Sequence, residues 1–404
     1  MFTRFPVATE TFLQREVRAL LGAGRPVELW SLWRGARSFG GHDIRRTPLW
    51  TLACLVFWIP YWVLRRPRQA GAVLGAVGHL RWRNATNYGE NLLGLGLAFG
   101  WARRIEREAS PETVLHAVWA SLPAAFGWGV SRLTGLPFTF AGHAYDLFED
   151  GGDGLLALKL RDACGVRTST RRGATRLKEL GAREDEVAVI GRGLAVLPPR
   201  VPRRPLAGPL RLLSVGRFVP KMGYDLLADV FDALEASGRS FEARVIGDGP
   251  TRTAFAGRAR LATWGPRVTL LGARPESDVW AALEWCDALL FTGKVAPNGD
   301  EAGFPNILGE AMALGRPVVA TPVGAVGEVL EHRQRAFLAA TPEAFAGELT
   351  RLVEEEKAGD AVVEAARQWV EAHFDAHRQM GLFWAWLGTV TAVGEEGSAP
   401  TKRH

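Results

Sequence analysis

The chain of 404 residues is 47% hydrophobic and 23% charged, as in a folded protein, and it is longer than one hydrophobic core normally supports, so two domains are expected. Charge is uneven, because residues 1–204 carry 29 Lys+Arg against 17 Asp+Glu and residues 205–404 carry 20 against 26. No helix-turn-helix, zinc or RNA-sheet signature accompanies the arginines, so nucleic acid is not expected as a partner, and a membrane surface is the favoured partner of the basic half.

The first half is α/β but irregular. Hydrophobic spacing predicts, in chain order, a helix over 8–22, a strand over 27–33, a strand over 113–119, a helix over 122–133 and a strand over 136–143. His116 falls within a strand pattern and is assigned to the core. An apolar insertion from about 45 to 68 interrupts this order.

The insertion contains an uncharged run, residues 48–64, that is almost wholly apolar and aromatic. As a helix it would be about 25 Å long, at the lower limit for crossing a bilayer, and Pro60 would kink it. We therefore expect a helix lying in the membrane interface, with a buried core helix as the alternative. Its anchors would be Trp50, Trp58, Tyr61 and Trp62, with Arg45, Arg46, Arg65, Arg66 and Arg68 at its flanks.

A segment rich in proline and arginine, residues 196–209, predicts a semi-rigid linker between domains. The expected division is a first domain over 1–200, a link over 201–209 and a second domain over 210–372. A helix over 373–390 would pack back on the first domain. A disordered tail over 391–404 would follow, because no hydrophobic pattern continues there.

The second half alternates strictly between strand and helix patterns, which predicts a parallel doubly wound sheet, because parallel strands need crossover helices. Strands are expected over 210–216, 241–247, 267–272, 287–292 and 316–321, and helices up to 238, over 251–262, and near 276–285 and 305–314. Two Rossmann-like domains of this kind would leave a cleft at the carboxyl ends of both sheets, where such sheets bind ligands.

The stretch Asn298–Thr321 has the features of a phosphate site. Gly303 lets a ligand approach the backbone, and Pro305 suits the first turn of a helix whose free N–H groups favour a phosphate or diphosphate. Glu310 lies about one and a half turns inside, within reach of a hydroxyl group such as that of a ribose. An ordinary solvated or capping acid is the alternative reading of Glu310.

Two basic residues, Arg217 and Lys221, follow the first strand of the second half and could bind a diphosphate. In the first half, His143 lies at a strand end with Asp146 three residues on, where it could contact a donor or stabilise developing charge.

A dehydrogenase is the alternative that an α/β pattern suggests, and it would need a full GxGxxG motif after a strand. Neither residues 247–252 nor residues 191–196 supply one, so this reading is weak.

Taken together, these motifs are similar to those of a known protein family. The chain resembles the retaining GT-B glycosyltransferases of family 4, particularly their colanic-acid and exopolysaccharide branch. The resemblance covers nearly the whole length and is carried by "LPFTFAGHAYDLF", "LLSVGRFVPKMGYDLL", "VIGDGPTR", "VTLLGARP" and "GFPNILGEAMALGRPVVATPVGAVGEV". It implies two Rossmann-like domains, a nucleoside-diphosphate-sugar donor, no further cofactor and no essential metal.

The resemblance also implies roles for single residues. Arg217 would bind the donor diphosphate, and Glu310, the second acid of the E-x7-E motif, would hold the nucleotide ribose. His143 would be the active-site histidine. The phosphates and sugar would lie against Gly303, Phe304, Pro305 and Asn306, and the nucleobase against Gly272 and Arg274.

Several positions depart from the family pattern. Ala302 stands where the first acid of the motif contacts the donor sugar, and Met222 replaces a lysine that helps to bind diphosphate. Thr170-Arg171 replaces Ser-Glu. The family's usual first strand is not apparent before Pro6, so it is either missing or the start site is set too late. Asp300, Glu301 and Lys221 offer similar charges one or two residues away, which makes Glu301 a catalytic candidate beside His143 and Glu310.

The sequence therefore predicts a glycosyltransferase of the hexosyltransferase type that moves a sugar from a UDP- or GDP-sugar to a lipid-linked or polysaccharide acceptor. The alternative is a nucleotide-sugar-binding scaffold with weakened catalysis, because Ala302 and Met222 both replace charged residues of the family pattern.

The three cysteines form no CxxC or zinc-like spacing and no cleavable signal is apparent. The expected location is cytoplasmic, peripheral on the inner face of the cell membrane.

Overall fold

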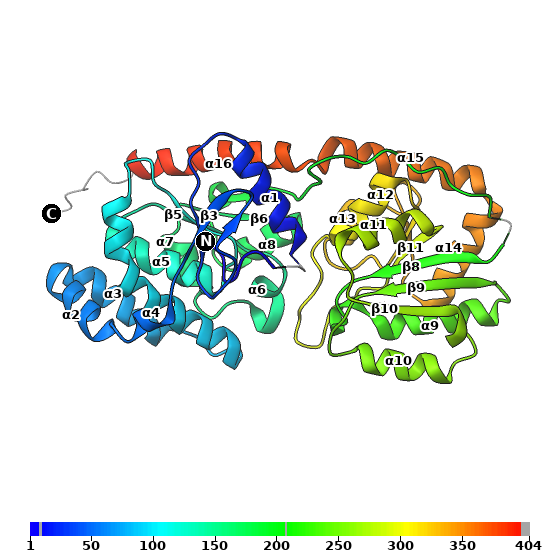
Figure 1. The fold of residues 1–404 in the computed structure, drawn as a ribbon, viewed down its shortest axis with the longest axis horizontal. Helices are drawn as coiled ribbons and strands as arrows, with labels where there is room; N and C mark the ends of the chain where they lie inside the picture. The colour runs from blue at the N-terminus through cyan, green and yellow to red at the C-terminus, as the bar shows by residue number, and fades with distance from the viewer. Residues whose placement is uncertain (8–9, 207, 397–404) are drawn as a thin grey trace. The chain divides into compact units, whose positions relative to one another are not determined.

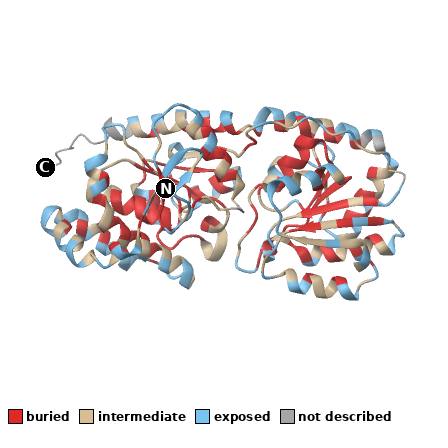
Figure 2. Cartoon of the chain, viewed as in Figure 1, coloured by how far each residue is buried: buried red, intermediate tan, exposed pale blue. Residues whose placement is uncertain are grey.

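The chain forms two compact units, which the computed structural model describes over residues 1–7, 10–206 and 208–396 (Figure 1). The first unit contains residues 1–191 together with the C-terminal helix from His377 onward. The second unit contains residues 192–376. Each has its own apolar core, drawn as buried segments in Figure 2.

The second unit is built on a six-stranded parallel sheet in the order β10-β9-β8-β11-β12-β13. Its strands are β8 (Leu210–Val215), β9 (Phe241–Ile246), β10 (Val268–Gly272), β11 (Ala288–Phe291), β12 (Val318–Ala320) and β13 (Phe337–Leu338). In chain order this is the 3-2-1-4-5-6 arrangement of a dinucleotide-type doubly wound sheet. The predicted parallel sheet is confirmed, and each predicted strand agrees within two residues at either end.

Helices join these strands, as parallel pairing requires. They are α9 (Tyr224–Ala236), α10 (Arg252–Leu261), α11 (Glu276–Trp285), α12 (Asn306–Leu314) and α13 (Val326–Val329); α14 (Pro342–Glu354) and α15 (Glu356–His373) follow the last strand. Gly315, at φ 75°, ends α12 in the left-handed conformation that glycine adopts at low cost, as its position before Pro317 predicted. The segment predicted as a linker packs on this unit through ion pairs of Arg203 with Asp360 and of Arg204 with Asp287.

The first unit holds a parallel sheet in the order β4-β5-β6-β7 and a smaller sheet in the order β1-β3-β2. The strands are β4 (Leu115–Ala117), β5 (Phe138–Ala141), β6 (Gly165–Thr168), β7 (Val187–Val189), β1 (Leu29–Ser31), β2 (Ser38–Phe39) and β3 (His42–Arg46). Among them β2 pairs antiparallel with β3. Besides the helices over residues 49–108 and the C-terminal helix described below, this unit contains α1 (Thr11–Gly22), α5 (Leu122–Thr134), α6 (Ala144–Phe148), α7 (Leu156–Asp162) and α8 (Arg171–Glu179).

Residues 1–3 stand where the family pattern has its usual first strand. The Phe2 amide donates to Trp30 O at 2.8 Å, and the Val118 amide donates to Met1 O at 3.1 Å. This short segment therefore connects β1 to the loop after β4. Burial lowers the pKa of the Met1 amino group to about 5, and that group donates to His116 O at 2.8 Å.

The apolar insertion is not one helix, which corrects the prediction for residues 48–64. It folds as a short 3-10 turn over Leu49–Leu52 and helix α2 (Leu55–Arg65), both packed on the long helix α4 (Ala85–Glu108). Helix α3 (Pro67–His79) follows and packs on α2 and α5. None of the described helices is both long and apolar enough to cross a bilayer.

Trp62 corrects a second expectation, because it was predicted to anchor the insertion in the membrane. Its side chain is fully buried, and its indole N–H donates to Phe99 O at 3.1 Å. Arg65 and Arg66, predicted as flanking cations, form ion pairs with Glu106 at 2.9 and 2.7 Å. Both faces of α2 are apolar, so the sequence could not indicate which face packs on α4.

The described part of the chain ends with α16 (Ala376–Glu396), which packs on the first unit. A Cβ placed on Gly165 of β6 would lie 2.9 Å from the Trp386 ring and 3.1 Å from Val390, so this strand and the helix are in close contact. His116 packs against the rings of Phe383 and Trp386, in agreement with its assignment to the core. The tail predicted as disordered from residue 391 is helical to Glu396, and residues 397–404 lie outside the described residues.

Candidate functional site

The candidate site of the second unit lies at the point where its strand order reverses. Strands β8 and β11 are neighbours, but the chain leaves β8 toward β9 on one side and leaves β11 toward β12 on the other. Ligands of such sheets bind outside the carboxyl ends of the two strands at this switch point. Arg217 and Lys221 follow β8, and the loop from Thr292 to Pro305 connects β11 to α12.

Backbone contacts join the loops at this edge of the sheet. Gly247 N donates to Gly272 O at 2.9 Å, Phe218 N donates to Asp248 O at 2.9 Å, and Lys294 N donates to Lys221 O at 2.9 Å. The loops after β10, β9, β8 and β11 are therefore linked in spatial order. Such links restrict loop motion and hold side chains in position before a ligand binds.

Two glycines make this close packing sterically possible. Gly223 has φ 64°, and a Cβ there would lie 1.8 Å from Thr292 O, at the end of β11. Gly247 has φ 144°, and a Cβ there would lie 1.8 Å from Gly216 O, after β8. Any other residue at either position would displace the loop that carries Arg217 or Lys221.

Arg217 and Lys221 share this edge but differ in their surroundings. Arg217 is exposed and its guanidinium forms no hydrogen bond or ion pair with a described residue, so the side-chain donors are available to a ligand. Lys221 is buried, and its ammonium forms an ion pair with Asp300 at 2.8 Å. Met222, where the family pattern has a lysine, is an apolar neighbour of the core instead. The loop therefore presents one unpaired cation, not two.

Helix α12 supplies the second feature of the site. It begins at Asn306, one residue later than the Pro305 expected in its first turn, and no acidic side chain lies in that turn. Its first N–H groups therefore favour an anion, as the sequence predicted for a phosphate. Asn306 Oδ1 is buried without a hydrogen-bond partner among the described residues. A Cβ placed on Gly303 would meet no atom within 4 Å, so the loop is open there.

Glu310 and Phe304 belong to this helix and the loop before it. Glu310 is buried in the second turn of α12 and is 6% exposed. Phe304 packs between the rings of Trp369 and Phe374, with centroid distances of 5.8 and 6.1 Å. This aromatic contact fixes the loop against α15 and its C-terminal end.

The substituted position of the E-x7-E motif lies in an apolar environment. Ala302 is 6% exposed and belongs to the core cluster around α12. Glu301 is also buried, and a Cβ on Gly324, after β12, would lie 3.5 Å from its carboxyl carbon. The carboxylate of Glu301 therefore lies near the loop after β12, while Asp300 pairs with Lys221.

The expected nucleobase contacts lie at the end of β10, on the far side of β9 from β8: Gly272 is the last residue of β10, and Arg274 follows the strand. Gly272 has φ 71° and lies at a break in the register with β9. Arg274 is exposed and has no partner among the described residues. The structure thus brings Arg217, Lys221, Glu301 and the start of α12 to the β8/β11 switch and leaves Gly272 and Arg274 two strands away.

In the first unit, His143 ends the segment after β5 and precedes α6. It is 4% exposed, and its ring lies edge-on to Trp119 at 5.2 Å between centroids. The Asp146 carboxylate accepts hydrogen bonds from the backbone N–H groups of His143 and Ala120, both at 2.7 Å. Burial raises the pKa of Asp146 to about 7. Asp146 therefore fixes the turn that carries His143.

A buried ionic network near this turn was not predicted. The Lys159 ammonium lies in a fully buried position and donates to Asp153 at 2.6 Å, to Asn91 at 2.7 Å and to Ala120 O at 2.5 Å. Burial lowers the pKa of Lys159, although Asp153 opposes this effect. No local motif could have revealed the network, because Asn91 and Lys159 are 68 positions apart.

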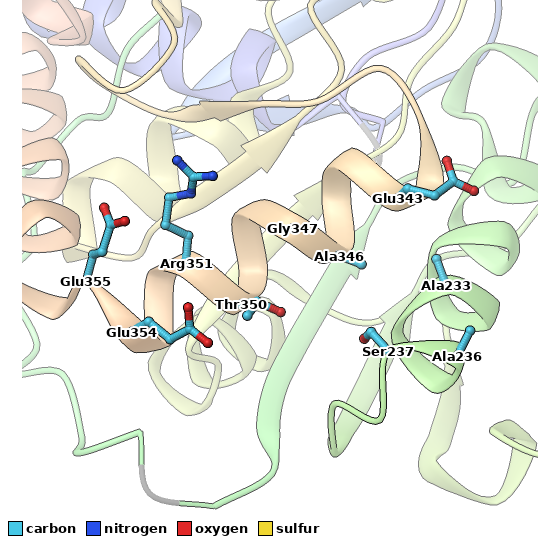
Figure 3. A pocket seen from close by; sticks show the side chains of 10 residues that line it. All are labelled: Ala233, Ala236, Ser237, Glu343, Ala346, Gly347, Thr350, Arg351, Glu354 and Glu355. Atoms are coloured by element: carbon cyan, nitrogen blue, oxygen red, sulfur yellow. The ribbon is translucent and has the colours of Figure 1, made fainter.

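A pocket elsewhere in the second unit contains none of the predicted residues. It lies between the end of α9 and the length of α14, and Figure 3 shows three glutamates and one arginine among its side chains. Its lining consists of Ala233, Ala236, Ser237, Glu343, Ala346, Gly347, Thr350, Arg351, Glu354 and Glu355. Within the described part of the chain, no three His, Cys, Asp or Glu side chains are grouped as a metal site.

Comparison with known proteins agrees with the features of the second unit. Residues 209–355 match the family described as Glycosyl transferases group 1. An amylovoran biosynthesis glycosyltransferase of Erwinia amylovora is 33% identical over 43% of this chain and 44% of its own length. WcaL of Escherichia coli K12, named as a colanic acid biosynthesis glycosyltransferase, is 25% identical over 92% of this chain and 94% of its own.

Solved structures show the same fold. The lipopolysaccharide outer core galactosyltransferase WaaB has a TM-score of 0.64 at 14% identity, covering 94% of this chain and 97% of its own. HepE of Anabaena, solved with UDP-glucose, has a TM-score of 0.59 at 19% identity, covering 72% and 82%. The chain therefore has the GT-B glycosyltransferase fold, and its residues 209–355 match the Glycosyl transferases group 1 family.

Proposed function

We propose that the chain is a retaining glycosyltransferase that moves a sugar from a nucleoside-diphosphate sugar to a lipid-linked or polysaccharide acceptor during exopolysaccharide synthesis. One observation carries the proposal. The unpaired Arg217 and the start of α12, which favours an anion, both lie at the β8/β11 switch point. Relatives named for amylovoran and colanic acid biosynthesis support the assignment to exopolysaccharides. The UDP-glucose complex of HepE supports a nucleotide-sugar donor.

In this proposal the donor diphosphate binds between Arg217 and the first N–H groups of α12. The loop Gly303–Asn306 lies along the phosphates and sugar, and Glu310 accepts hydrogen bonds from ribose hydroxyls. A buried carboxylate near a hydroxyl-bearing ligand discriminates strongly, because a ligand that lacked the hydroxyl would leave it unpaired. Gly272 and Arg274 would contact the nucleobase, and UDP and GDP donors are both candidates.

The proposed reaction exchanges one bond to the anomeric carbon for another. The bond between that carbon and the diphosphate oxygen breaks, and its electron pair remains on the leaving phosphate. The acceptor oxygen bonds to the same face of the carbon and gives its proton to the departing phosphate oxygen, so configuration is retained without a covalent enzyme intermediate. Arg217 and the helix start would stabilise the leaving charge without a metal ion. We assign His143 the stabilisation of developing charge or the positioning of the sugar, and not the role of a covalent catalyst.

The altered motif motivates a second candidate, a nucleotide-sugar-binding scaffold with weak turnover. Ala302 lies in an apolar cluster and Lys221 is paired with Asp300, so neither supplies a free charge to the donor. Each missing transition-state charge costs on the order of 3 kcal/mol, or about a hundredfold in rate. Glu301, a buried neighbour of Ala302, would have to replace the missing acid for full activity.

Titration with a panel of UDP- and GDP-sugars, followed by a transfer assay with membrane lipid extract, separates the two candidates. The transferase predicts binding of one donor and formation of a lipid-linked sugar product. The scaffold predicts binding of the same donor without product. Absence of binding across the panel would contradict both, because both place a diphosphate at Arg217.

The peripheral location on the inner face of the cell membrane is part of this proposal. A lipid-linked acceptor resides at a membrane, and the first half of the chain is basic, with 29 Lys+Arg against 17 Asp+Glu over residues 1–204. An anionic membrane surface attracts such a charge distribution.

A further inference from the structure

We propose that the outer face of the α2–α3 hairpin is a docking surface for an anionic lipid bilayer, into whose interface its apolar side chains insert without crossing. The inference rests on the proposed function, because a protein docked on the bilayer by this surface would encounter its lipid-linked acceptor there. It assigns the membrane contact to particular residues, of which only Trp50 is among the anchors expected from the sequence.

The hairpin has two apolar faces, and only one of them is covered. The inner face holds Trp62, Ala70, Val73 and Ala76, all at most 1% exposed, within the main core cluster of the first unit. A helix that packs on a globular protein normally has a polar outer face. The surface of α2 and α3 departs from that rule, because many of its exposed side chains are apolar; Figure 2 shows where the exposed segments lie.

The outer face of α2 is almost entirely apolar. Its exposed residues before Arg65 are Val56 (68%), Phe57 (73%), Pro60, Val63 (40%) and Leu64 (86%). The spacing of 56, 57, 60, 63 and 64 places them along one side of the helix. Leaving such large apolar side chains in water is unfavourable, and exposed apolar groups gathered in this way mark a binding surface.

Helix α3 and the two flanking segments add further exposed apolar side chains. Leu74 and Val77 are 41% and 42% exposed on α3, beside exposed glycines in the same helix. Trp50 precedes the hairpin and Trp82 follows it, and they are 66% and 67% exposed. We call the set Trp50, Val56, Phe57, Val63, Leu64, Leu74, Val77 and Trp82 the hairpin surface. Exposed tryptophans at the ends of an apolar segment suit the level of lipid headgroups.

The positive charge around the hairpin indicates that its partner is a lipid surface of negative charge. No Asp or Glu occurs between residues 44 and 89. Arg46, Arg68 and Arg81 lie before, within and after the hairpin, are exposed, and form no ion pair with a described residue. A second copy of the chain would place the same arginines opposite one another, because a twofold interface pairs like surfaces. An anionic membrane would neutralise them.

The experiment measures partitioning of the full chain onto vesicles of phosphatidylcholine, with and without phosphatidylglycerol. The test variant is Phe57→Ser/Leu64→Ser, and the matched control is Val196→Ser/Leu261→Ser, whose side chains are 81% and 92% exposed in the second unit. Each buried apolar side chain contributes about tenfold or more to partitioning. The test variant is expected to bind vesicles at least about a hundredfold more weakly, and the control within about twofold of the natural chain.

A second variant tests the choice of anionic lipid. Arg46→Gln/Arg68→Gln/Arg81→Gln is expected to lose most of the preference for phosphatidylglycerol, at about fivefold for each arginine. Thermal unfolding of both variants should match that of the natural chain, because all five substituted side chains are exposed and unpaired.

Three outcomes would overturn the inference: a natural chain that binds no vesicle, a Phe57→Ser/Leu64→Ser variant that binds as the natural chain does, or a dimer in solution that this variant dissociates. Donor titration in the absence of vesicles keeps the two proposals apart. Vesicle binding without donor binding would refute the transferase and support the hairpin surface, whereas donor binding without vesicle binding would do the reverse.

Discussion

Replacement of Arg217 by alanine should weaken donor binding without destabilising the protein. The side chain is exposed and has no partner among the described residues, so its removal breaks no intramolecular contact. Hydrogen bonds to a charged group contribute about 1.5–3 kcal/mol, and each 1.4 kcal/mol is a factor of ten in affinity. The dissociation constant for a UDP- or GDP-sugar should therefore rise by about 10- to 100-fold.

Calorimetric titration of the natural chain and of Arg217→Ala measures this change. Arg260→Ala is the matched control, since Arg260 is exposed and unpaired in the last turn of α10, which runs back to the opposite edge of the same sheet. The control should bind donor as the natural chain does, and both variants should keep the natural melting temperature. Equal weakening by the two substitutions would show a general charge effect and refute the assignment of Arg217 to the diphosphate.

Three further predictions concern stability. Gly247→Ala should cost about 3 kcal/mol, or about 6–12 °C in melting temperature, because its Cβ would clash with the backbone, whereas Gly238→Ala meets no atom within 4 Å and should cost about 1 kcal/mol. Trp62→Ala should cost about 3–5 kcal/mol in denaturant unfolding, and Trp50→Ala less than about 0.5 kcal/mol. Burial raises the pKa of Asp146 to about 7 from an ordinary 3.8, so the unfolded chain loses this proton first. Stability should therefore fall as pH rises from about 4 to about 7, by up to about 1.4 kcal/mol per pH unit, and Asp146→Asn should flatten the pH dependence of the melting temperature.

The second unit was largely predictable because its strands are short apolar runs separated by turns and helices with their own end signals. The run Leu210–Gly216 and the stop at Gly315 before Pro317 are local patterns, and the structure confirms the elements they predict. The ion pair of Lys221 with Asp300 was not predicted, because it joins loops 79 positions apart. Sequence could indicate that both charges lie near the site but not that they neutralise each other.

The first unit shows where local reasoning fails. The apolar run of residues 48–64 indicated a helix with an unusual surface, but no periodicity separates a covered face from an open one when both are apolar. Trp62 was therefore chosen as a membrane anchor although it is buried against α4, whereas Phe57 and Leu64, which are exposed, were not singled out. The Lys159 network was missed for the related reason that its partners are distant in sequence.

A crystal structure of the protein soaked with a nucleoside-diphosphate sugar tests the central claim most directly. The account predicts that the diphosphate lies at the β8/β11 switch of the second unit, in contact with the Arg217 guanidinium and the first N–H groups of α12, with Glu310 on the ribose side. A diphosphate bound elsewhere, or a bound donor that leaves Arg217 in solvent, would contradict the account.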